Sequence, residues 1–138
     1  MLKSLESDPK KKKFTKKETL CSTIAGNPCE MLTITSGSKS EKKGVVFTAR
    51  VHPGESVGSW MMQGVLDFLT DTKNPEAAIL REHFVFKIVP MLNPDGVING
   101  NYRCSLAGCD LNRRWNKPSL TLHPTIYHTK KLIKHFAQ

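Results

Sequence analysis

Short blocks of apolar residues, separated by polar turns, predict strands in the first third of the chain. The first block is TLCSTIA at residues 19–25, and turn-forming residues separate it from MLTIT at 31–35, where apolar residues alternate with threonine. A polar, glycine-bounded stretch at 36–44 predicts a surface loop. The nearly continuous apolar run VVFTARV at 45–51 then predicts a strand that is buried on both faces of a sheet.

From Ser56 the spacing of apolar residues changes to that of a helix. The predicted buried face consists of residues three and four positions apart, namely Val57, Trp60, Met61, Val65 and Phe68, and Leu66 and Leu69 widen it. A second helix is expected to begin at Pro75 with Asn74 as its cap. A buried strand is predicted to follow at residues 84–92.

The last third of the chain contains a turn signal and one further helix. NPDG at 93–96 is typical of a turn after a strand, and residues 123–138 predict a closing amphipathic helix with Pro124 near its start. Strands that alternate with helices indicate an α/β domain. The predicted fold is therefore a mixed β-sheet with flanking helices.

Length and charge limit the domain organisation and the kinds of partner. At 138 residues the chain fits one domain. Residues 10–17 contain six lysines, so we expect residues 1–18 to be a flexible lead-in and residues 19–138 to form the domain. The formal net charge of +9 indicates attraction to an acidic partner, whether nucleic acid, anionic lipid or an acidic protein segment.

The composition argues against a membrane protein and against a disulfide framework. No apolar run approaches the roughly 20 residues that span a bilayer, and no secretory signal is evident at the start. We therefore expect a cytosolic protein without a membrane partner. The cysteine spacings do not match structural zinc sites, so Cys21, Cys29, Cys104 and Cys109 are expected to be free thiols.

The segment VFTARVHPGESVGSW, residues 46–60, carries candidate metal ligands. His52 and Glu55 stand three residues apart where a buried strand ends, the place at which α/β sheets collect functional residues. Imidazole and carboxylate groups both bind Zn²⁺ at about 2.0 to 2.2 Å, and a set of two His and one Glu with an open position is a known catalytic arrangement. Taken alone, the pattern is ordinarily a surface His and Glu pair.

The segment MLNPDGVINGNYRCSLAGCDLNRRW, residues 91–115, changes this interpretation. With the blocks TLCSTIAGNP, LTIT, TARVHPGE and HPTIYH, read in chain order, it resembles the zinc metallocarboxypeptidases related to carboxypeptidase A, specifically their cytosolic branch. Gly54 stands where the digestive enzymes carry an arginine, which is similar to the cytosolic branch. The resemblance implies the amino-terminal portion of a carboxypeptidase A-like (phosphorylase/hydrolase-like) domain, incomplete within this chain.

The resemblance also implies roles for individual residues. It assigns His52 and Glu55 to one Zn²⁺ ion per complete domain, and Arg103 to the scissile carbonyl, where an always-charged guanidinium would stabilise the developing oxyanion. It places Asp110 behind the zinc-bound histidine as an orienting partner.

Two further residues match the pair that grips the terminal carboxylate of a substrate. These are Asn112 and Arg113, the latter offering a fork of hydrogen-bond donors to a carboxylate. The family's third ligand lies in a D-x-H-G-H-like segment and its catalytic glutamate further on, and no residue of this chain matches either. We therefore expect weak zinc binding, an inactive chain, and a sheet with an unpaired edge.

The resemblance implies acidic protein tails, notably those of tubulin, as substrates from which carboxy-terminal or side-chain glutamates are removed. It thus implies a cytoplasmic enzyme associated with microtubules. Two other classes stay open: a non-catalytic module that binds acidic tails through Asn112 and Arg113, and a nucleic-acid binder, which we do not favour because only the charge supports it. As structural alternatives, the same pair caps a loop, and Arg103 pairs with Asp110 at the surface.

Overall fold

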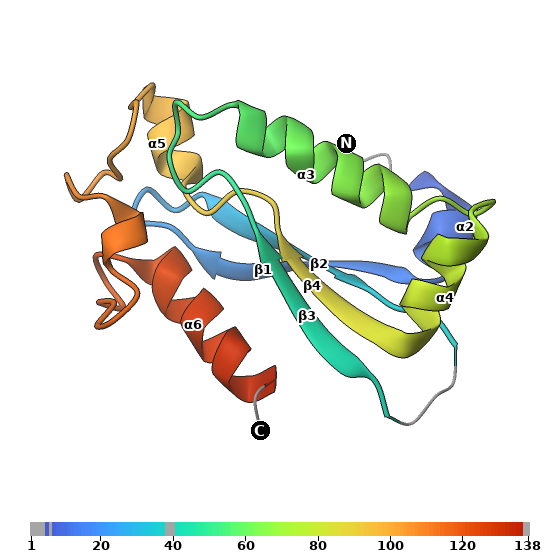
Figure 1. The fold of residues 1–138 in the computed structure, drawn as a ribbon. Helices are drawn as coiled ribbons and strands as arrows, with labels where there is room; N and C mark the ends of the chain where they lie inside the picture. The colour runs from blue at the N-terminus through green and yellow to red at the C-terminus, as the bar shows by residue number, and fades with distance from the viewer. Residues whose placement is uncertain (1–4, 6, 38–40, 137–138) are drawn as a thin grey trace.

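A mixed four-stranded sheet lies between helices in the computed structural model, which describes residue 5, residues 7–37 and residues 41–136 (Figure 1). Its strands are β1 (Thr15–Ser22), β2 (Pro28–Ile34), β3 (Lys43–Thr48) and β4 (Phe84–Val89). The spatial order is β1-β2-β4-β3. Antiparallel pairing joins β1 to β2 and β2 to β4, whereas β3 runs parallel to β4, so the predicted mixed sheet is confirmed.

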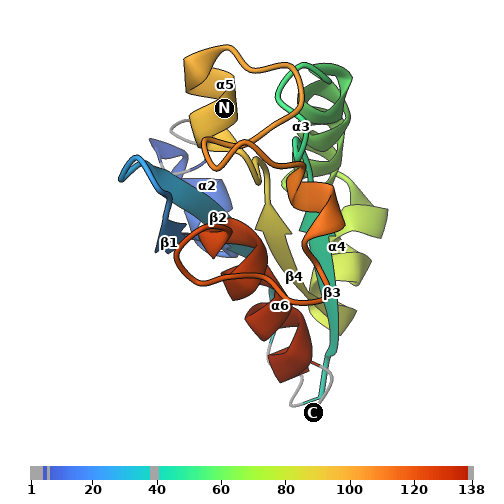
Figure 2. The same ribbon diagram turned by 90° about the vertical axis from the view of Figure 1, so that its left-hand side faces the viewer.

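Helices cover both faces of this sheet. The described helices are α2 (Pro9–Lys12), α3 (Val57–Leu69), α4 (Pro75–His83), α5 (Pro94–Asn99), the short 3-10 helix η1 (Leu111–Arg113) and α6 (Pro124–Phe136). Figures 1 and 2 show α3 and α4 on one side of the sheet and α6 on the other. The predicted cap of α4 is confirmed, because the Asn74 side chain accepts hydrogen bonds from the amides of Glu76 and Ala77.

The alternation of side chains along the strands divides the core into two parts. The part under α3 contains Leu32, Ile34, Met62, Leu66, Leu69, Phe86 and Ile88. The part under α6 contains Cys29, Met31, Val89, Leu92, Leu111 and Ile126. Because successive strand residues point to opposite faces, β2 contributes to both parts and is buried between the helices.

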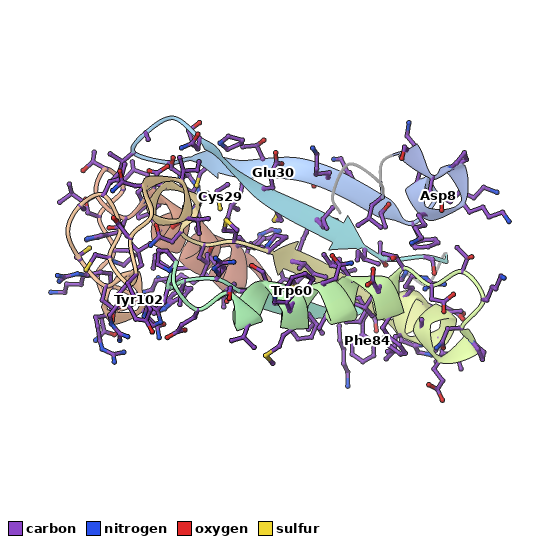
Figure 3. The ribbon with its side chains drawn as sticks, turned by 90° about the horizontal axis from the view of Figure 1, so that it is seen from above. Asp8, Cys29, Glu30, Trp60, Phe84 and Tyr102 are labelled. Carbon is purple, nitrogen blue, oxygen red and sulfur yellow. The ribbon has the colours of Figure 1, made fainter. Side chains whose placement is uncertain are left out.

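The predicted buried face of α3 is confirmed for Leu66 and Leu69 and is wrong for the residues at the start of the helix. The side that packs on the sheet carries Met62, Leu66 and Leu69, whereas Val57, Trp60 and Met61 are 62%, 75% and 69% exposed. Trp60 is labelled at α3 in Figure 3. The helix is apolar on most of its circumference, so periodicity did not distinguish the inner side from the outer one.

The strands differ from their predicted bounds by a few residues, with β4 ending at Val89 rather than at residue 92, and β1 and β3 differ most. The first begins at Thr15 rather than at residue 19, so part of the expected lead-in belongs to β1, and α2 lies before it. Lysines are tolerated there because β1 is an edge strand with one polar face, on which Lys16 pairs with Glu18 at 2.7 Å. The division at residue 19 stays a prediction as a domain boundary.

The strand expected to be buried on both faces is instead the other edge of the sheet. β3 pairs only with β4 among the described strands, and Phe47 is 38% exposed. Its Gly44 lies under the ring of Phe136, which leaves no room for a side chain there. Among the residues that the structure describes, no helix has both the length and the apolar character needed to cross a bilayer.

Candidate metal and substrate site

The chain turns sharply after β3, and this turn delivers the first two candidate residues. Arg50 has a φ of 51°, in the left-handed region that non-glycine residues rarely adopt. Its side chain ties the turn together: Nε donates to the Pro53 carbonyl at 2.8 Å, and Nη1 donates to Ser59 Oγ in α3 at 2.7 Å. Such backbone strain persists only where the surroundings enforce it. The contacts of Arg50 therefore hold in place the turn formed by residues 52–55, which we call the HPGE turn. The sequence does not predict this role, because an arginine at the end of a strand carries no special signal.

His52 and Glu55 converge at this turn. The imidazole Nδ1 lies 3.1 Å from Glu55 Oε2, and the imidazole is buried at 7% exposure whereas Glu55 is exposed. The other ring nitrogen, Nε2, lies 3.0 Å from Oδ1 of Asp110, which is 58 residues further along the chain. The structure therefore places one imidazole between two carboxylates.

This arrangement fits a cation between His52 and Glu55. A neutral imidazole has one N–H, and if Nε2 donates it to Asp110, Nδ1 presents a lone pair toward the Glu55 carboxylate. Two such acceptors at 3.1 Å repel each other unless a proton or a metal ion lies between them. Metal-binding histidines typically use their second nitrogen in this way, donating it to a carboxylate. The two residues thus fit as two ligands of a zinc ion.

Asp110 also binds the candidate oxyanion residue. Arg103 donates from Nε to Asp110 Oδ2 at 3.0 Å, and its Nη2 lies 2.8 Å from the same oxygen. The paired guanidinium is 46% exposed, so it forms the outer side of the cluster. The ion pair that we weighed as a structural alternative is present, and it lies beside His52 rather than apart from the site.

Hydrogen bonds to Asp110 keep its carboxylate charged. Burial by itself would raise the pKa of Asp110, but hydrogen bonds from His52, from the Asn112 amide and from Arg103 together lower the pKa below its usual range. A carboxylate that stays ionised is the form that accepts the imidazole N–H.

The two predicted carboxylate-binding residues lie within η1. Asp110 caps this 3-10 turn by accepting a hydrogen bond from the Asn112 amide at 2.8 Å. The Asn112 side chain accepts a hydrogen bond from Trp115 Nε1 at 3.0 Å, and Arg113 is exposed to solvent. The loop role that we weighed for Asn112 is therefore present, while the Arg113 guanidinium is accessible to a ligand.

The NPDG segment supports the site from behind and begins a helix rather than ending in a simple turn. Asn93 caps α5 by accepting from the Gly96 amide, and its Nδ2 donates to the Val51 carbonyl next to His52 at 3.3 Å. A Cβ on Gly96 would lie 2.5 Å from Pro53 Cγ, so α5 packs directly against the HPGE turn. The short proline-initiated helix was missed because its six residues have too little periodicity to predict it.

Asp95 in the same segment binds the β1–β2 turn. Its carboxylate accepts hydrogen bonds from Thr23 Oγ1 at 2.6 Å, Asn27 Nδ2 at 2.8 Å and the Ala25 amide at 3.1 Å. Burial alone would raise the pKa of Asp95, but these hydrogen bonds outweigh it and lower the pKa.

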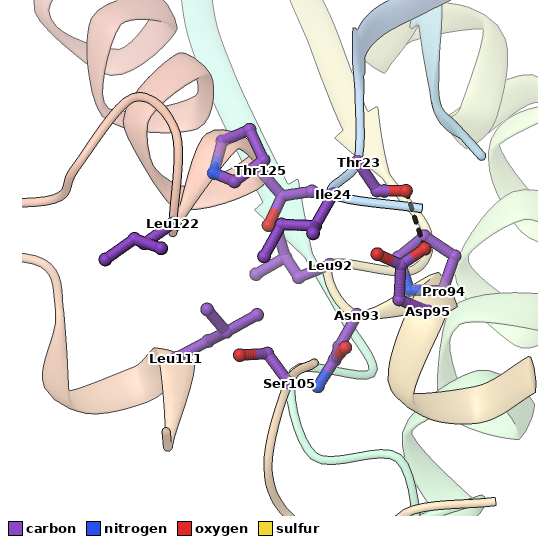
Figure 4. Close-up of a pocket in the computed structure, with 11 residues that line it drawn as sticks. Thr23, Ile24, Leu92, Asn93, Pro94, Asp95, Ser105, Leu111, Leu122 and Thr125 are labelled. Atoms are coloured by element: carbon purple, nitrogen blue, oxygen red, sulfur yellow. Dashed lines mark hydrogen bonds between the residues drawn. The ribbon is translucent and has the colours of Figure 1, made fainter. Parts of the chain in front are cut away.

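A small pocket beside Asp95 is not the candidate site. Figure 4 shows it between the β1–β2 turn, α5 and the start of α6, lined by residues that include Ile24, Leu92 and Ser105. Its volume of about 20 Å³ has room for roughly one water molecule. None of the six predicted site residues lines it.

The fold is that of a zinc carboxypeptidase. The zinc carboxypeptidase family profile matches residues 2–131, and the chain belongs to this family. Among the curated relatives it is 52% identical to cytosolic carboxypeptidase 4 of Homo sapiens over 92% of this chain and 12% of that protein. It is 53% identical to cytosolic carboxypeptidase 2 of Xenopus tropicalis over 96% of this chain and 14% of that protein.

Solved structures show the same fold. A metallo-carboxypeptidase from Burkholderia cenocepacia superposes with a TM-score of 0.87 at 32% identity, covering 97% of this chain and 35% of that one. Carboxypeptidase A from Helicoverpa armigera, at 18% identity and a TM-score of 0.73, shares the fold over 98% of this chain and 40% of that one. The predicted carboxypeptidase A-like fold is confirmed, and the chain spans about one third of the Burkholderia structure.

The zinc carboxypeptidase family implies a zinc ion. Among the described residues, no cluster of three or more His, Cys, Asp or Glu side chains is placed to hold a metal ion. His52 and Glu55 form a pair of two such groups, with Nδ1 and Oε2 3.1 Å apart.

Proposed function

We propose that this chain provides part of the active site of a cytosolic-type zinc carboxypeptidase that removes carboxy-terminal or side-chain glutamates from acidic protein tails such as those of tubulin. The observation that carries the proposal is the contact of His52 Nδ1 with Glu55 Oε2 at 3.1 Å, with Nε2 held by Asp110 at 3.0 Å. We place the protein in the cytoplasm, with its substrate on microtubules.

The side chains divide the chemical work as follows. His52 and Glu55 would hold zinc, which when bound supplies Lewis-acid polarisation of a carbonyl and activation of a water molecule. Asp110 keeps the proton on Nε2 of His52, so that Nδ1 is free to bind the metal. Arg103 donates to the carbonyl oxygen as negative charge develops on it, and losing one such donor typically costs about 3 to 4 kcal/mol.

Substrate orientation would come from Asn112 and Arg113. A guanidinium presents two parallel N–H donors that match the two oxygens of a carboxylate. Arg113 is exposed and is the last residue of η1, the 3-10 turn that Asp110 caps. A chain end bound to Arg113 would therefore lie close to the cluster around His52. Binding of a terminal carboxylate selects the last residue of a substrate and gives exopeptidase specificity.

An acidic substrate is supported by the basic residues of η1, of the loop after it and of α6, here called the basic strip. Residues 111–138 contain six of the 21 basic residues and none of the twelve acidic ones. The basic strip consists of Arg113, Arg114, Lys117, Lys130, Lys131 and Lys134. Lys130 joins its two ends, since its Nζ donates to the carbonyls of Trp115 and Asn116, both at 2.7 Å.

The second candidate is a non-catalytic module that binds acidic tails. It is favoured by the absence of a three-group metal cluster among the described residues. We propose that the chain by itself does not turn over substrate, because two ligands hold zinc weakly and no general base is matched. Both candidates predict carboxylate binding at Arg113, and they differ in hydrolysis.

A zinc titration tests the metal site. Wild-type protein is expected to bind Zn²⁺ at one weak site in a calorimetric titration, and His52→Ala to lose that binding. His135→Ala removes an exposed histidine on α6 and is expected to bind as wild type does. Absence of binding in wild type, or an unchanged isotherm in His52→Ala, would contradict the assignment.

A peptide experiment tests the substrate proposal. Glutamate-rich peptides with a free carboxy terminus are expected to bind wild type on the order of tenfold more tightly than amidated peptides, as charged hydrogen bonds contribute about 1.5 to 3 kcal/mol. Arg113→Gln should abolish the difference, whereas Lys73→Gln, between α3 and α4, should preserve it. Equal affinity of wild type for both peptides would rule out the carboxylate grip.

Hydrolysis separates the two candidate functions. Incubation of the chain with zinc and a glutamate-rich peptide, followed by mass spectrometry, is expected to show no released glutamate. Release of glutamate that is lost in His52→Ala would instead assign the complete activity to this chain.

A further inference from the structure

Two cysteines face each other across the first hairpin. Cys21 in β1 and Cys29 in β2 are register partners, and Cys29 is labelled in Figure 3. Partner Cα atoms in antiparallel strands are about 4.5 to 5.5 Å apart, which lies within the range of about 4.4 to 6.8 Å that disulfides span. Side chains of register partners point to the same face of a sheet, so the two sulfur atoms are neighbours. All four cysteines are free thiols in this structure.

The two thiols differ in accessibility and in acidity. Cys29 is completely buried, and its Sγ lies 3.7 Å from the Met91 carbonyl, to which the thiol donates. Cys21 is half-buried. A hydrogen bond with Cys29 lowers the pKa of Cys21, whereas the same contact and burial raise the pKa of Cys29. Because the thiolate is the reactive form, Cys21 is the thiol that reacts first and Cys29 is the one beside it that closes the bond.

We propose that Cys21 and Cys29 form an oxidation site at which hydrogen peroxide closes a disulfide across the β1–β2 hairpin. The Cys21 thiolate attacks one peroxide oxygen, the O–O bond breaks, and the released hydroxide takes up a proton as water. The resulting sulfenic acid is attacked by the Cys29 sulfur, and its hydroxyl group leaves with the Cys29 proton as a second water. Two thiols and one peroxide thus give one disulfide and two waters.

The position of the pair connects it to the candidate site. The turn between the two strands supplies the three donors that hold Asp95 at the start of α5. Oxidation also removes the Cys29 S–H that donates to Met91, two residues before Asn93, which in turn holds the Val51 carbonyl next to His52. A disulfide would therefore alter the support of the HPGE turn without touching its residues.

Peptide mass analysis tests the proposal on the wild-type chain. After peroxide treatment, quenching in acid, unfolding and alkylation, the tryptic peptide 18–39 contains both cysteines. We expect this peptide to lack alkyl groups and to be lighter by two hydrogen atoms, with reversal by a reducing agent. Cys104 and Cys109, on another peptide, should be alkylated. A fully alkylated peptide 18–39, or one carrying sulfinic acid without a disulfide, would overturn the proposal.

Variants identify which thiol reacts first. Cys29→Ser should trap Cys21 as a sulfenic acid that dimedone labels, whereas Cys21→Ser should leave Cys29 unlabelled because it is buried. Cys29→Ala provides the same test without placing a hydroxyl group in the core. The thermal midpoint of unfolding should change on oxidation in wild type and in Cys104→Ser. It should not change in the variants that lack Cys21 or Cys29. Dimedone labelling of Cys29 in preference to Cys21 would contradict the assigned order.

Discussion

Single residues in this structure act through shared carboxylates. Asp110 binds His52, Arg103 and the Asn112 amide in η1, so one side chain organises the candidate metal ligand, the candidate oxyanion donor and the candidate carboxylate-binding turn. Asp95 does the same for the β1–β2 turn and α5. Each has its pKa lowered by these hydrogen bonds against the effect of burial, which makes both sensitive to substitution and to acid.

Asp110→Asn tests the positioning of His52. An amide has an acceptor oxygen but no charge, and it holds the imidazole N–H and Arg103 less firmly. We expect zinc affinity to fall about 10 to 100-fold, as is typical when such a partner is removed. The measurement is a calorimetric zinc titration. Asp67→Asn removes an exposed carboxylate on α3 and is the control; an equal loss of affinity in both variants would contradict the role of Asp110.

The second residue-scale prediction concerns acid stability and Asp95. Because its folded pKa lies below the ordinary value of 3.8, its stabilising effect is complete above that pH and is lost as the pH falls through the folded value. Asp95→Asn should lower the free energy of unfolding by about 1.5 to 3 kcal/mol at pH 7, because a neutral amide replaces the carboxylate that accepts from three donors. Urea denaturation should show that the free energy of unfolding falls less between pH 7 and low pH in Asp95→Asn than in wild type. Parallel losses would contradict this assignment.

At the scale of elements, helix ends and turns decide how the site is presented. α5 begins at Pro94 and packs its first turn on the HPGE turn, and Gly54 donates its amide to the Tyr102 carbonyl at 2.7 Å. Tyr102, labelled in Figure 3, leaves no space for a side chain at Gly54, because a Cβ there would lie 2.4 Å from its ring. The HPGE turn is therefore held on two sides by segments that lie far from it in the sequence.

Two glycine substitutions separate the effect of the contact between α5 and the HPGE turn from the effect of helix propensity. Gly96→Ala places a Cβ 2.5 Å from Pro53 Cγ and 2.7 Å from Asn93 Oδ1, so we expect a loss of about 1 to 3 kcal/mol and weaker zinc binding. Gly64→Ala, inside α3, has nothing within 4 Å of the new Cβ and should stabilise by about 0.5 to 1 kcal/mol. Chemical denaturation measures both. A neutral Gly96→Ala would show that α5 moves without consequence.

On the scale of the whole molecule, the apolar surface is as informative as the core. The outer face of α3 carries Val57, Trp60 and Met61, and a wholly apolar groove runs beside Phe68 between α3 and the edge strand β3. Patches of this kind are uncommon on monomeric proteins and favour association. Among the described strands, the outer edge of β3 is unpaired, which adds a second route to association.

Substitutions on the two sides of α3 test which side is the core. Leu66→Ala, at a completely buried position, should cost about 2 to 5 kcal/mol of unfolding free energy. Trp60→Gln, at a position that is 75% exposed, should change stability by about 0.5 kcal/mol or less and should lower self-association. Denaturation and sedimentation at several concentrations measure the two effects. A large loss of stability in Trp60→Gln would show that its ring is part of the core.

Much of the fold followed from local patterns, because strands, caps and turns depend on neighbouring residues. The alternation at Leu32 and Ile34, the capped start of α4 and the mixed sheet were all predicted and are confirmed. The errors occurred where local patterns carry no direction. The apolar residues of α3 surround most of the helix, so their spacing does not separate the inner side from the outer one. The lysines of β1 were interpreted as a flexible lead-in, but an edge strand tolerates such charged residues as well.

The sequence by itself determined the family and the chemical identity of the candidate ligands, because these residues lie in contiguous blocks that resemblance and spacing both detect. Only the tertiary structure decided that His52 binds Asp110 through Nε2 and Glu55 through Nδ1, and that Arg50 and Asn93 hold the turn between them. The physical reason is that such contacts join side chains far apart in the chain. Their geometry depends on how the sheet and its helices pack, which no local periodicity records.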